Sequence, residues 1–192
     1  MATEIELKAW VDNPQAVQLK LDSIAEFKGS FDRADEYWFP KDGEKRSFPK
    51  SGLRIRGETF AFPDGRAEEI VHATFKNKEL RDGIEVNDER EFDVSSAAEF
   101  EELLALLGLE KRKAKHKKGR SYKYQSLTAE LTELMGLGWF AEIEILADNS
   151  RSETVAKARA ELLGFLAKIG IDESKIETRY YTEMLASISP RA

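Results

Sequence analysis

The 192-residue chain contains no cysteine and only two histidines, His72 and His116. Without cysteine the protein can form no disulfide, no thiolate zinc site and no cysteine nucleophile. With so few histidines, histidine-based metal sites and Ser-His-Asp triads are nearly excluded. A metal site in this protein would therefore be built from carboxylates, and oxygen-only ligation favours Mg²⁺ or Mn²⁺ over zinc or copper.

Long apolar runs and an excess of positive charge are missing as well. No run is long enough to cross a membrane, and a charged segment begins at residue 4, so we expect no signal peptide. The formal net charge of −6 argues against general nucleic-acid binding. These absences predict a cytoplasmic protein that has neither nucleic acid nor membrane as a partner. The hydrophobic fraction of 41% is enough for the core of one domain, expected to span residues 1–192.

The apolar periodicity predicts an α+β protein with many strands and few helices. Helices are expected at 14–24, 96–107, 152–169 and 176–188, the first capped by Asn13. Strands are expected at 4–11, 31–39, 53–58, 68–76, 85–94, 128–134 and 139–146, with a hairpin at 111–124 and turns at 40–43 and 63–65. Many antiparallel strands with few helices are typical of a closed or nearly closed barrel.

The segment Glu4-Ile5-Glu6-Leu7-Lys8 alternates charged and apolar residues. On a strand, Glu4, Glu6 and Lys8 share one face, while the apolar residues take the other. Two carboxylates on one strand face can share a hard cation, and the lysine beside them can hold the anion that the cation carries. A single strand of this kind is more typical of an exposed strand with a charged outer face.

The same arrangement recurs along the chain, with core residues on the opposite face of each strand. The pairs that share a face are Arg54 and Arg56, Thr74 and Lys76, Glu89 and Glu91, Lys118 and Arg120, and Glu142 and Glu144. An exposed outer face would not need such regular pairing of like charges. The repetition therefore predicts an inverted barrel, with a polar interior and an apolar exterior covered by helices.

The paired charges of the expected interior balance one another. The carboxylates Glu4, Glu6, Glu89, Glu91, Glu142 and Glu144 equal in number the cations Lys8, Arg54, Arg56, Lys76, Lys118 and Arg120. Added divalent cations and a chain of three phosphates would leave the site close to neutral, as burial of charge requires. Arginine forks bind phosphate oxygens in bidentate fashion, and lysines act as point charges. An exposed-surface interpretation stays open for Glu89 and Glu91, and for the basic run 111–123.

These segments resemble, in register, the motifs of the CYTH family, the triphosphate tunnel metalloenzymes, and most closely its class IV adenylyl cyclase-like branch. Glu4–Lys8 matches the family's Glu-x-Glu-x-Lys signature. Further matches are Asp35-Glu36-Tyr37, Leu53-Arg54-Ile55-Arg56, Thr74-Phe75-Lys76, the strand segment 136–144 and Tyr181-Thr182-Glu183-Met184-Leu185. The resemblance implies an eight-stranded antiparallel tunnel over nearly the whole chain that binds a triphosphate and metal ions. The chain departs from the family at Thr132, where an aspartate is common. Glu130 on the same strand face is the candidate substitute.

The resemblance also implies site residues for metal-assisted phosphoryl transfer. The expected catalytic residues are Glu4, Glu6, Lys8, Glu142 and Glu144; the metal ligands are Glu4, Glu6, Glu89, Glu91, Glu142 and Glu144; and the substrate-binding residues are Lys8, Arg54, Arg56, Lys76, Lys118 and Arg120. We expect a phosphohydrolase that uses Mg²⁺ or Mn²⁺ on inorganic triphosphate or a triphosphate-bearing small molecule. The alternatives are an adenylyl cyclase that converts ATP to cyclic AMP and pyrophosphate, and a non-catalytic sensor of polyphosphate or nucleotide. The apolar C-terminal helix is a candidate homodimer contact.

Overall fold

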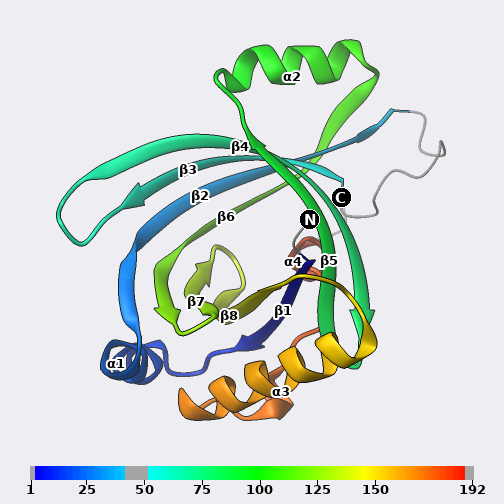
Figure 1. Cartoon of the computed structure of the whole chain (residues 1–192). Coiled ribbons are helices and arrows are strands. Elements are labelled where there is room, and N and C mark those ends of the chain that lie inside the picture. Colours follow the sequence, from blue (N-terminus) through cyan, green and yellow to red (C-terminus); the bar gives the residue numbers. More distant parts are fainter. Residues whose placement is uncertain (1–2, 42–51, 189–192) are drawn as a thin grey trace.

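The computed structural model describes residues 3–41 and 52–188. Within these residues, eight antiparallel strands close into a barrel in the order β1-β5-β4-β3-β2-β6-β7-β8 (Figure 1). The strands are β1 (Thr3–Trp10), β2 (Glu26–Pro40), β3 (Leu53–Ala61), β4 (Ala67–Arg81), β5 (Ile84–Asp93), β6 (Leu109–Tyr124), β7 (Leu127–Leu134) and β8 (Gly138–Ala147). The predicted α+β class and antiparallel barrel are thus confirmed.

Four α-helices lie outside the strands of this barrel: α1 (Pro14–Ile24), α2 (Ala97–Leu106), α3 (Ser152–Lys168) and α4 (Tyr181–Ile188). A short 3₁₀ helix, η1 (Glu173–Lys175), precedes α4. Helix α1 begins where predicted, because the Asn13 side chain accepts a hydrogen bond from the Ala16 amide and Pro14 stands in the first turn. Ser96 caps α2 in the same way through the Glu99 amide. No helix in the described part of the chain is long and apolar enough to cross a membrane.

The hydrophobic core lies outside the barrel wall, as the inverted pattern predicts. Ile5 and Leu7 of β1 and Ile143 of β8 point outward and pack against Leu162 and Phe165 of α3 in one buried cluster. In Figure 1, α1 and α3 cover this side of the barrel, while α2 stands at the opposite end. Because the apolar faces of these strands are satisfied outside, their charged faces are directed inward.

Two elements differ from the sequence-based expectation. The predicted hairpin at 111–124 is wrong, because the whole segment forms one long strand, β6, which pairs with β2 along its length and with β7 at its end. Its glycine, Gly119, makes no turn and lies within the strand. Glycine suits this position because a side chain there would collide with Phe31 and the Leu131 carbonyl. The expected helix at 176–188 begins only at Tyr181, because Ile176 bridges to Ala9 of β1. Half of the turn predicted at 40–43 falls outside the described residues, which end at 41 before resuming at 52.

Candidate active site

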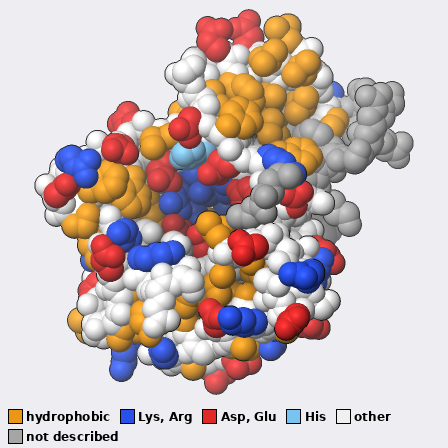
Figure 2. Space-filling model, in the orientation of Figure 1, with side chains coloured by type: hydrophobic (Ala, Val, Ile, Leu, Met, Phe, Trp, Pro, Cys, Tyr) orange, Lys and Arg blue, Asp and Glu red, His pale blue; other side chains and the backbone are white. Residues whose placement is uncertain are grey.

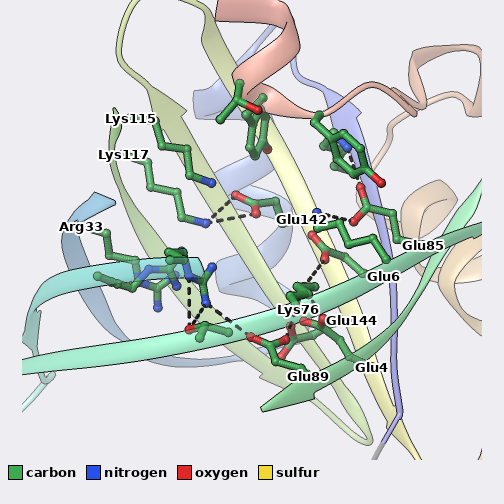
Figure 3. Close-up of a pocket in the computed structure, with 18 of the residues that line it drawn as sticks. Glu4, Glu6, Arg33, Lys76, Glu85, Glu89, Lys115, Lys117, Glu142 and Glu144 are labelled. Atoms are coloured by element: carbon green, nitrogen blue, oxygen red, sulfur yellow. Dashed lines mark hydrogen bonds and ion pairs between the residues drawn. The ribbon is translucent and has the colours of Figure 1, made fainter. Parts of the chain in front are cut away.

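The barrel encloses a cavity of about 550 Å³. Figure 2 shows its mouth, with basic side chains inside and acidic side chains around them. Helix α4 packs over one end of the cavity, where Tyr181 and Met184 form a buried cluster with Leu134 and Phe140 from the barrel strands (Figure 3). Tyr181 and Met184 on the apolar face of α4 are therefore used within the chain itself, and the homodimer contact of this helix stays a prediction.

Charge is divided between two sides of this cavity. Four strands that are consecutive around the barrel, β7, β8, β1 and β5, supply what we call the carboxylate half: Glu4, Glu6, Glu85, Glu89, Glu91, Glu130, Glu142 and Glu144. The other four, β4, β3, β2 and β6, supply the cation half: Arg33, Arg54, Arg56, Lys76, Lys78, Lys113, Lys115 and Lys117. Lys8 is the exception, a cation on β1 whose ammonium lies 2.9 Å from Glu85 Oε1. The two halves balance in charge, which lets so many ionised groups share a buried space.

Four carboxylates of the carboxylate half gather around one ammonium. Lys76 reaches from β4 across to β1 and β5, where it pairs with Glu4 and lies 3.4 Å from Glu6 Oε2 and 3.5 Å from Glu89 Oε2. Glu144 of β8 lies beside Glu4 in the same cluster, as Figure 3 shows. One lysine cannot neutralise four buried carboxylates, so the excess negative charge must be relieved by protons or by a further cation.

Burial and the excess negative charge shift the pKa values of the carboxyl groups in this cluster. Burial, followed by the neighbouring charge of Glu4, raises the pKa of Glu144 to about 9. Burial also raises the pKa of Glu6, although the Lys76 ammonium opposes the effect. For Glu4, burial is outweighed by the Lys76 ammonium and by hydrogen bonds, and the net pKa is lowered. Glu4 and Glu144 therefore share one proton at neutral pH, with the charge on Glu4.

The cluster fits a hard divalent cation by its chemistry. Its donors are carboxylate oxygens only, they come from three neighbouring strands, and their charges repel one another. Among the described residues, no three His, Cys, Asp or Glu side chains are spaced as a finished metal site. The Lys76 ammonium contacts Glu4, Glu6 and Glu89 in this cluster, and Glu144 is hydrogen-bonded to Glu4. A cation of higher charge that took this position would hold all four oxygen ligands without the shared proton.

The cation half is held together by its own counter-ion. Asp35 of β2 is almost fully buried and accepts two hydrogen bonds from Arg56 of β3, at 2.7 and 3.0 Å. The Lys115 ammonium of β6 lies 3.3 Å from the same carboxylate. Burial opposes ionisation of Asp35, but Arg56 and then Lys115 hold its pKa well below the usual range. Burial lowers the pKa of Lys115 to about 8. Asp35 thus fixes two cations so that their free N–H groups face the cavity.

Near the boundary between β6 and β7, individual ion pairs join the halves. Lys117 donates to both oxygens of Glu142, at 2.9 and 3.0 Å, and Arg33 donates to both oxygens of Glu130, at 2.7 and 2.8 Å. Burial raises the pKa of Glu142, but the charges of Lys117 and then Lys115 outweigh it and keep the group ionised. Glu130 lies in the cavity wall on the same face as the fully buried Thr132, as predicted. These two glutamates are already engaged with cations.

Most residues selected from the sequence do line the cavity. They are Glu4, Glu6, Lys8, Arg54, Arg56, Lys76, Glu89, Glu91, Glu142 and Glu144. Glu91 lies near the mouth, where it accepts hydrogen bonds from Thr74 and Arg54. Glu89 is more enclosed, with 21% of its side chain exposed, whereas 42% of the Glu91 side chain is exposed, so Glu91 belongs to both the cavity and the surface.

The prediction that Lys118 and Arg120 face the tunnel is wrong. Lys118 points outward to Asp32 at 2.8 Å, and Arg120 lies over the Phe27 ring and donates to the Tyr122 hydroxyl. The alternation along β6 directs the other set inward, namely Lys113, Lys115 and Lys117. Tyr122 carries the signal that identifies the faces: it shares a face with Lys118 and Arg120 and packs in the outer core.

Sequence reasoning also missed Arg33, Lys78 and Glu85. Lys78 extends the inward face of β4 by one alternation beyond Lys76, Glu85 extends that of β5 by two alternations beyond Glu89, and the two side chains pair at 2.7 Å. Lys78 and then Lys8 outweigh the effect of burial and lower the pKa of Glu85 to about 2. The two-residue alternation of inward and outward side chains could have identified residues on these strands, because it continues beyond the recognisable motifs.

The chain is similar in sequence and fold to known proteins. Residues 2–181 match the family model of the CYTH domain. Among solved structures, the PH1819 protein of Pyrococcus horikoshii OT3 is 25% identical, with a TM-score of 0.78 over 96% of this chain and 98% of that one. A putative adenylate cyclase from Vibrio parahaemolyticus is 21% identical, with a TM-score of 0.76 over 95% and 97%. The putative adenylyl cyclase HpAC1 from Hippeastrum is 17% identical, with a TM-score of 0.62 over 97% and 96%. The comparison with curated proteins found no match.

Proposed function

The chain belongs to the CYTH family, and we propose that it is a metal-dependent phosphohydrolase that acts on inorganic triphosphate or a triphosphate-bearing small molecule. The observation that carries the proposal is the division of the cavity into a carboxylate half and a cation half on opposite strands. A metal ion on the first and a phosphate chain on the second would meet in the space between them. The cytoplasm, predicted from composition, is the proposed compartment.

The residues that would hold Mg²⁺ or Mn²⁺ are Glu4, Glu6, Glu89 and Glu144. Three of them contact the Lys76 ammonium and Glu144 lies against Glu4, so the four carry more negative charge than Lys76 can neutralise. Glu91 and Glu142 are also predicted ligands, but they already form ion pairs with Arg54 and Lys117. We therefore propose them as secondary metal ligands. When bound, the metal would neutralise phosphate charge and activate water.

The proposed role of the cation half is to bind and orient the phosphate chain. Arg56 is held rigidly by Asp35, so its remaining N–H groups keep a constant direction. Lys115 and Lys113 add point charges from the neighbouring strand. Preorganised cations of this kind stabilise charge that develops on the leaving phosphate. Helix α4 excludes solvent from one end of the cavity.

Hydrolysis also requires a group that takes a proton from the attacking water. With a metal ion bound, the proton shared by Glu4 and Glu144 would be displaced, and a carboxylate of the cluster that does not bind the metal could act as the base. We propose that a carboxylate of this cluster accepts the water proton while the cation half holds the terminal phosphate in line for attack.

Product analysis tests this function. Purified full-length protein is incubated with tripolyphosphate, ATP or thiamine triphosphate, each with Mg²⁺ or Mn²⁺, and the products are separated. Orthophosphate release from tripolyphosphate without cyclic AMP would establish the triphosphatase. As a control, Lys118→Gln is assayed in parallel and should behave like wild type, because Lys118 lies outside the cavity on the same strand as Lys117.

Two other outcomes identify the alternatives. The Hippeastrum protein is described both as a putative adenylyl cyclase and as having a dominant triphosphatase activity, so one fold carries both names. Cyclic AMP and pyrophosphate from ATP would make this protein a cyclase. Tight binding of tripolyphosphate with no product from any substrate would make it a sensor.

A further inference from the structure

We propose that Lys76 is a tethered cation that holds the place of the divalent metal, so that metal binding must displace its ammonium toward the phosphate chain. The inference rests on the proposed function and adds a specific role for one residue. It makes Lys76 a residue that sets metal affinity and links it to substrate binding.

The contacts of Lys76 carry the proposal. Its Nζ pairs with Glu4 and approaches Glu6 and Glu89 within 3.5 Å, so carboxylates from two strands converge on one nitrogen. The side chain is buried, with 13% of its surface exposed. Lys78, two residues further along the same face, instead pairs with Glu85. The cluster of four glutamates is therefore occupied by Lys76 in particular.

A metal ion and this ammonium cannot occupy the cluster together. Both are cations, and both require the same carboxylate oxygens within a few ångströms. When the metal enters, the like charge expels the ammonium, and the tether of β4 limits where it can go. β4 lies between β5 and β3, and its Thr74 stands opposite Arg54 of β3. With the β5 side taken by the metal, the displaced group would move to the side of Arg54 and Arg56, where the phosphate chain would lie. There it can act as a point charge on a phosphate oxygen.

Thermodynamic linkage follows from this exchange. Without phosphate, a metal must remove Lys76 from its carboxylates and leave the ammonium with no anion. With a phosphate chain bound, the displaced ammonium gains a new partner. Each ligand therefore strengthens binding of the other by the same factor, typically about 5- to 150-fold for coupled sites. The protein would bind free metal weakly and the metal–triphosphate complex tightly.

Titration of the full chain with Mn²⁺ alone, by calorimetry in the absence of any phosphate, tests the displacement. Lys76→Met should bind Mn²⁺ about tenfold more tightly than wild type, because the competing cation is gone. Lys78→Met is the matched control: it removes one charge from the same face but leaves the cluster occupied, and its Mn²⁺ affinity should change by less than about twofold. In Mg²⁺-supported assays, Lys76→Met should also raise the KM for tripolyphosphate, because the phosphate loses a ligand. A merely structural role would not tighten metal binding while weakening substrate binding.

Equal Mn²⁺ affinity in wild type and Lys76→Met, or an equal gain in Lys78→Met, would overturn the inference while leaving the proposed function intact. Wild-type protein that binds no Mn²⁺ even with an imido-linked triphosphate would instead contradict the proposed function. If Lys76→Met fails to fold, wild-type protein with ¹⁵N-labelled lysine gives the same test. Mg²⁺ without phosphate should shift the Lys76 ammonium resonance, assigned with Lys76→Arg, and leave that of Lys78 in place. An unmoved Lys76 resonance would overturn the inference.

Discussion

The two halves of the cavity accommodate buried charge in different ways. In the cation half, each arginine contacts a carboxylate, as Arg56 does Asp35 and Arg33 does Glu130, and these pairs fix the side chains in place. In the carboxylate half, Glu4 and Glu144 face each other and one of them is protonated. The comparison teaches that the cation half is preorganised by the protein alone, whereas the carboxylate half is completed by a cation from outside. Four predictions test this contrast.

The largest expected effect comes from removing a charge from the carboxylate half. Glu6→Gln should lower the turnover of tripolyphosphate by a factor on the order of 10³, because an amide is a poor ligand for a hard cation and the buried charge balance is lost. Binding of tripolyphosphate in chelator should be unchanged or stronger, since the phosphate meets less negative charge. Orthophosphate release and calorimetry measure the two effects. Full activity in Glu6→Gln would show that the metal cluster is misassigned.

Removing a charge from the cation half should reduce the stability of the fold, in addition to weakening phosphate binding. Arg56→Met leaves Asp35 buried with only Lys115 nearby, and breaking a buried ion pair on one side costs about 3–5 kcal/mol of unfolding free energy. Urea denaturation measures the loss. The double variant Arg56→Met/Asp35→Asn should recover much of it, because no uncompensated charge remains. A single variant as stable as wild type would mean that the pair does not hold this half together.

The shared proton makes stability depend on pH in the carboxylate half. The pKa of Glu144 is raised from 4.5 to about 9 in the folded chain, so its contribution is fully present below pH 4.5 and is lost as pH rises toward 9. In the presence of a chelator, the unfolding free energy of Glu144→Gln should fall less than that of wild type between pH 5 and pH 9. At pH 9 the variant should be about 1–3 kcal/mol more stable than wild type. Subtracting the two urea-denaturation profiles removes the contribution of Lys115, which is present in both proteins. Parallel profiles would mean that Glu144 is not the protonated partner.

The smallest expected effect separates the two faces of β6. Lys117→Gln should raise the KM for tripolyphosphate roughly tenfold, because one charge-assisted hydrogen bond is lost. Lys118→Gln should leave the KM within about twofold, since an exposed pair with Asp32 contributes little. The two residues are neighbours in the chain, so the comparison isolates the direction of the side chain. Equal KM values for both variants would place the phosphate outside the cation half.

Several parts of this molecule could be predicted from the sequence because they depend on local alternation. The inward faces of β1, β3 and β8 carry paired charges opposite good core residues, so the inward direction of Glu4, Arg54 and Glu144 could be predicted. On β6 both faces carry lysine or arginine, and the alternation alone did not tell which face is inside. Only the packing of Tyr122 against the outer core decided it.

What the sequence determined by itself is therefore the pattern of the wall: strands with one charged and one apolar face, a cavity without cysteine or histidine ligands, and carboxylates suited to a hard cation. The tertiary structure decided which charges meet. Lys76 and Glu6 are 70 residues apart in the chain, and Arg56 and Asp35 are joined only because β2 pairs with β3 in one register. Such contacts depend on strand order and on closure of the barrel, which are non-local and leave no trace in the period of any single strand.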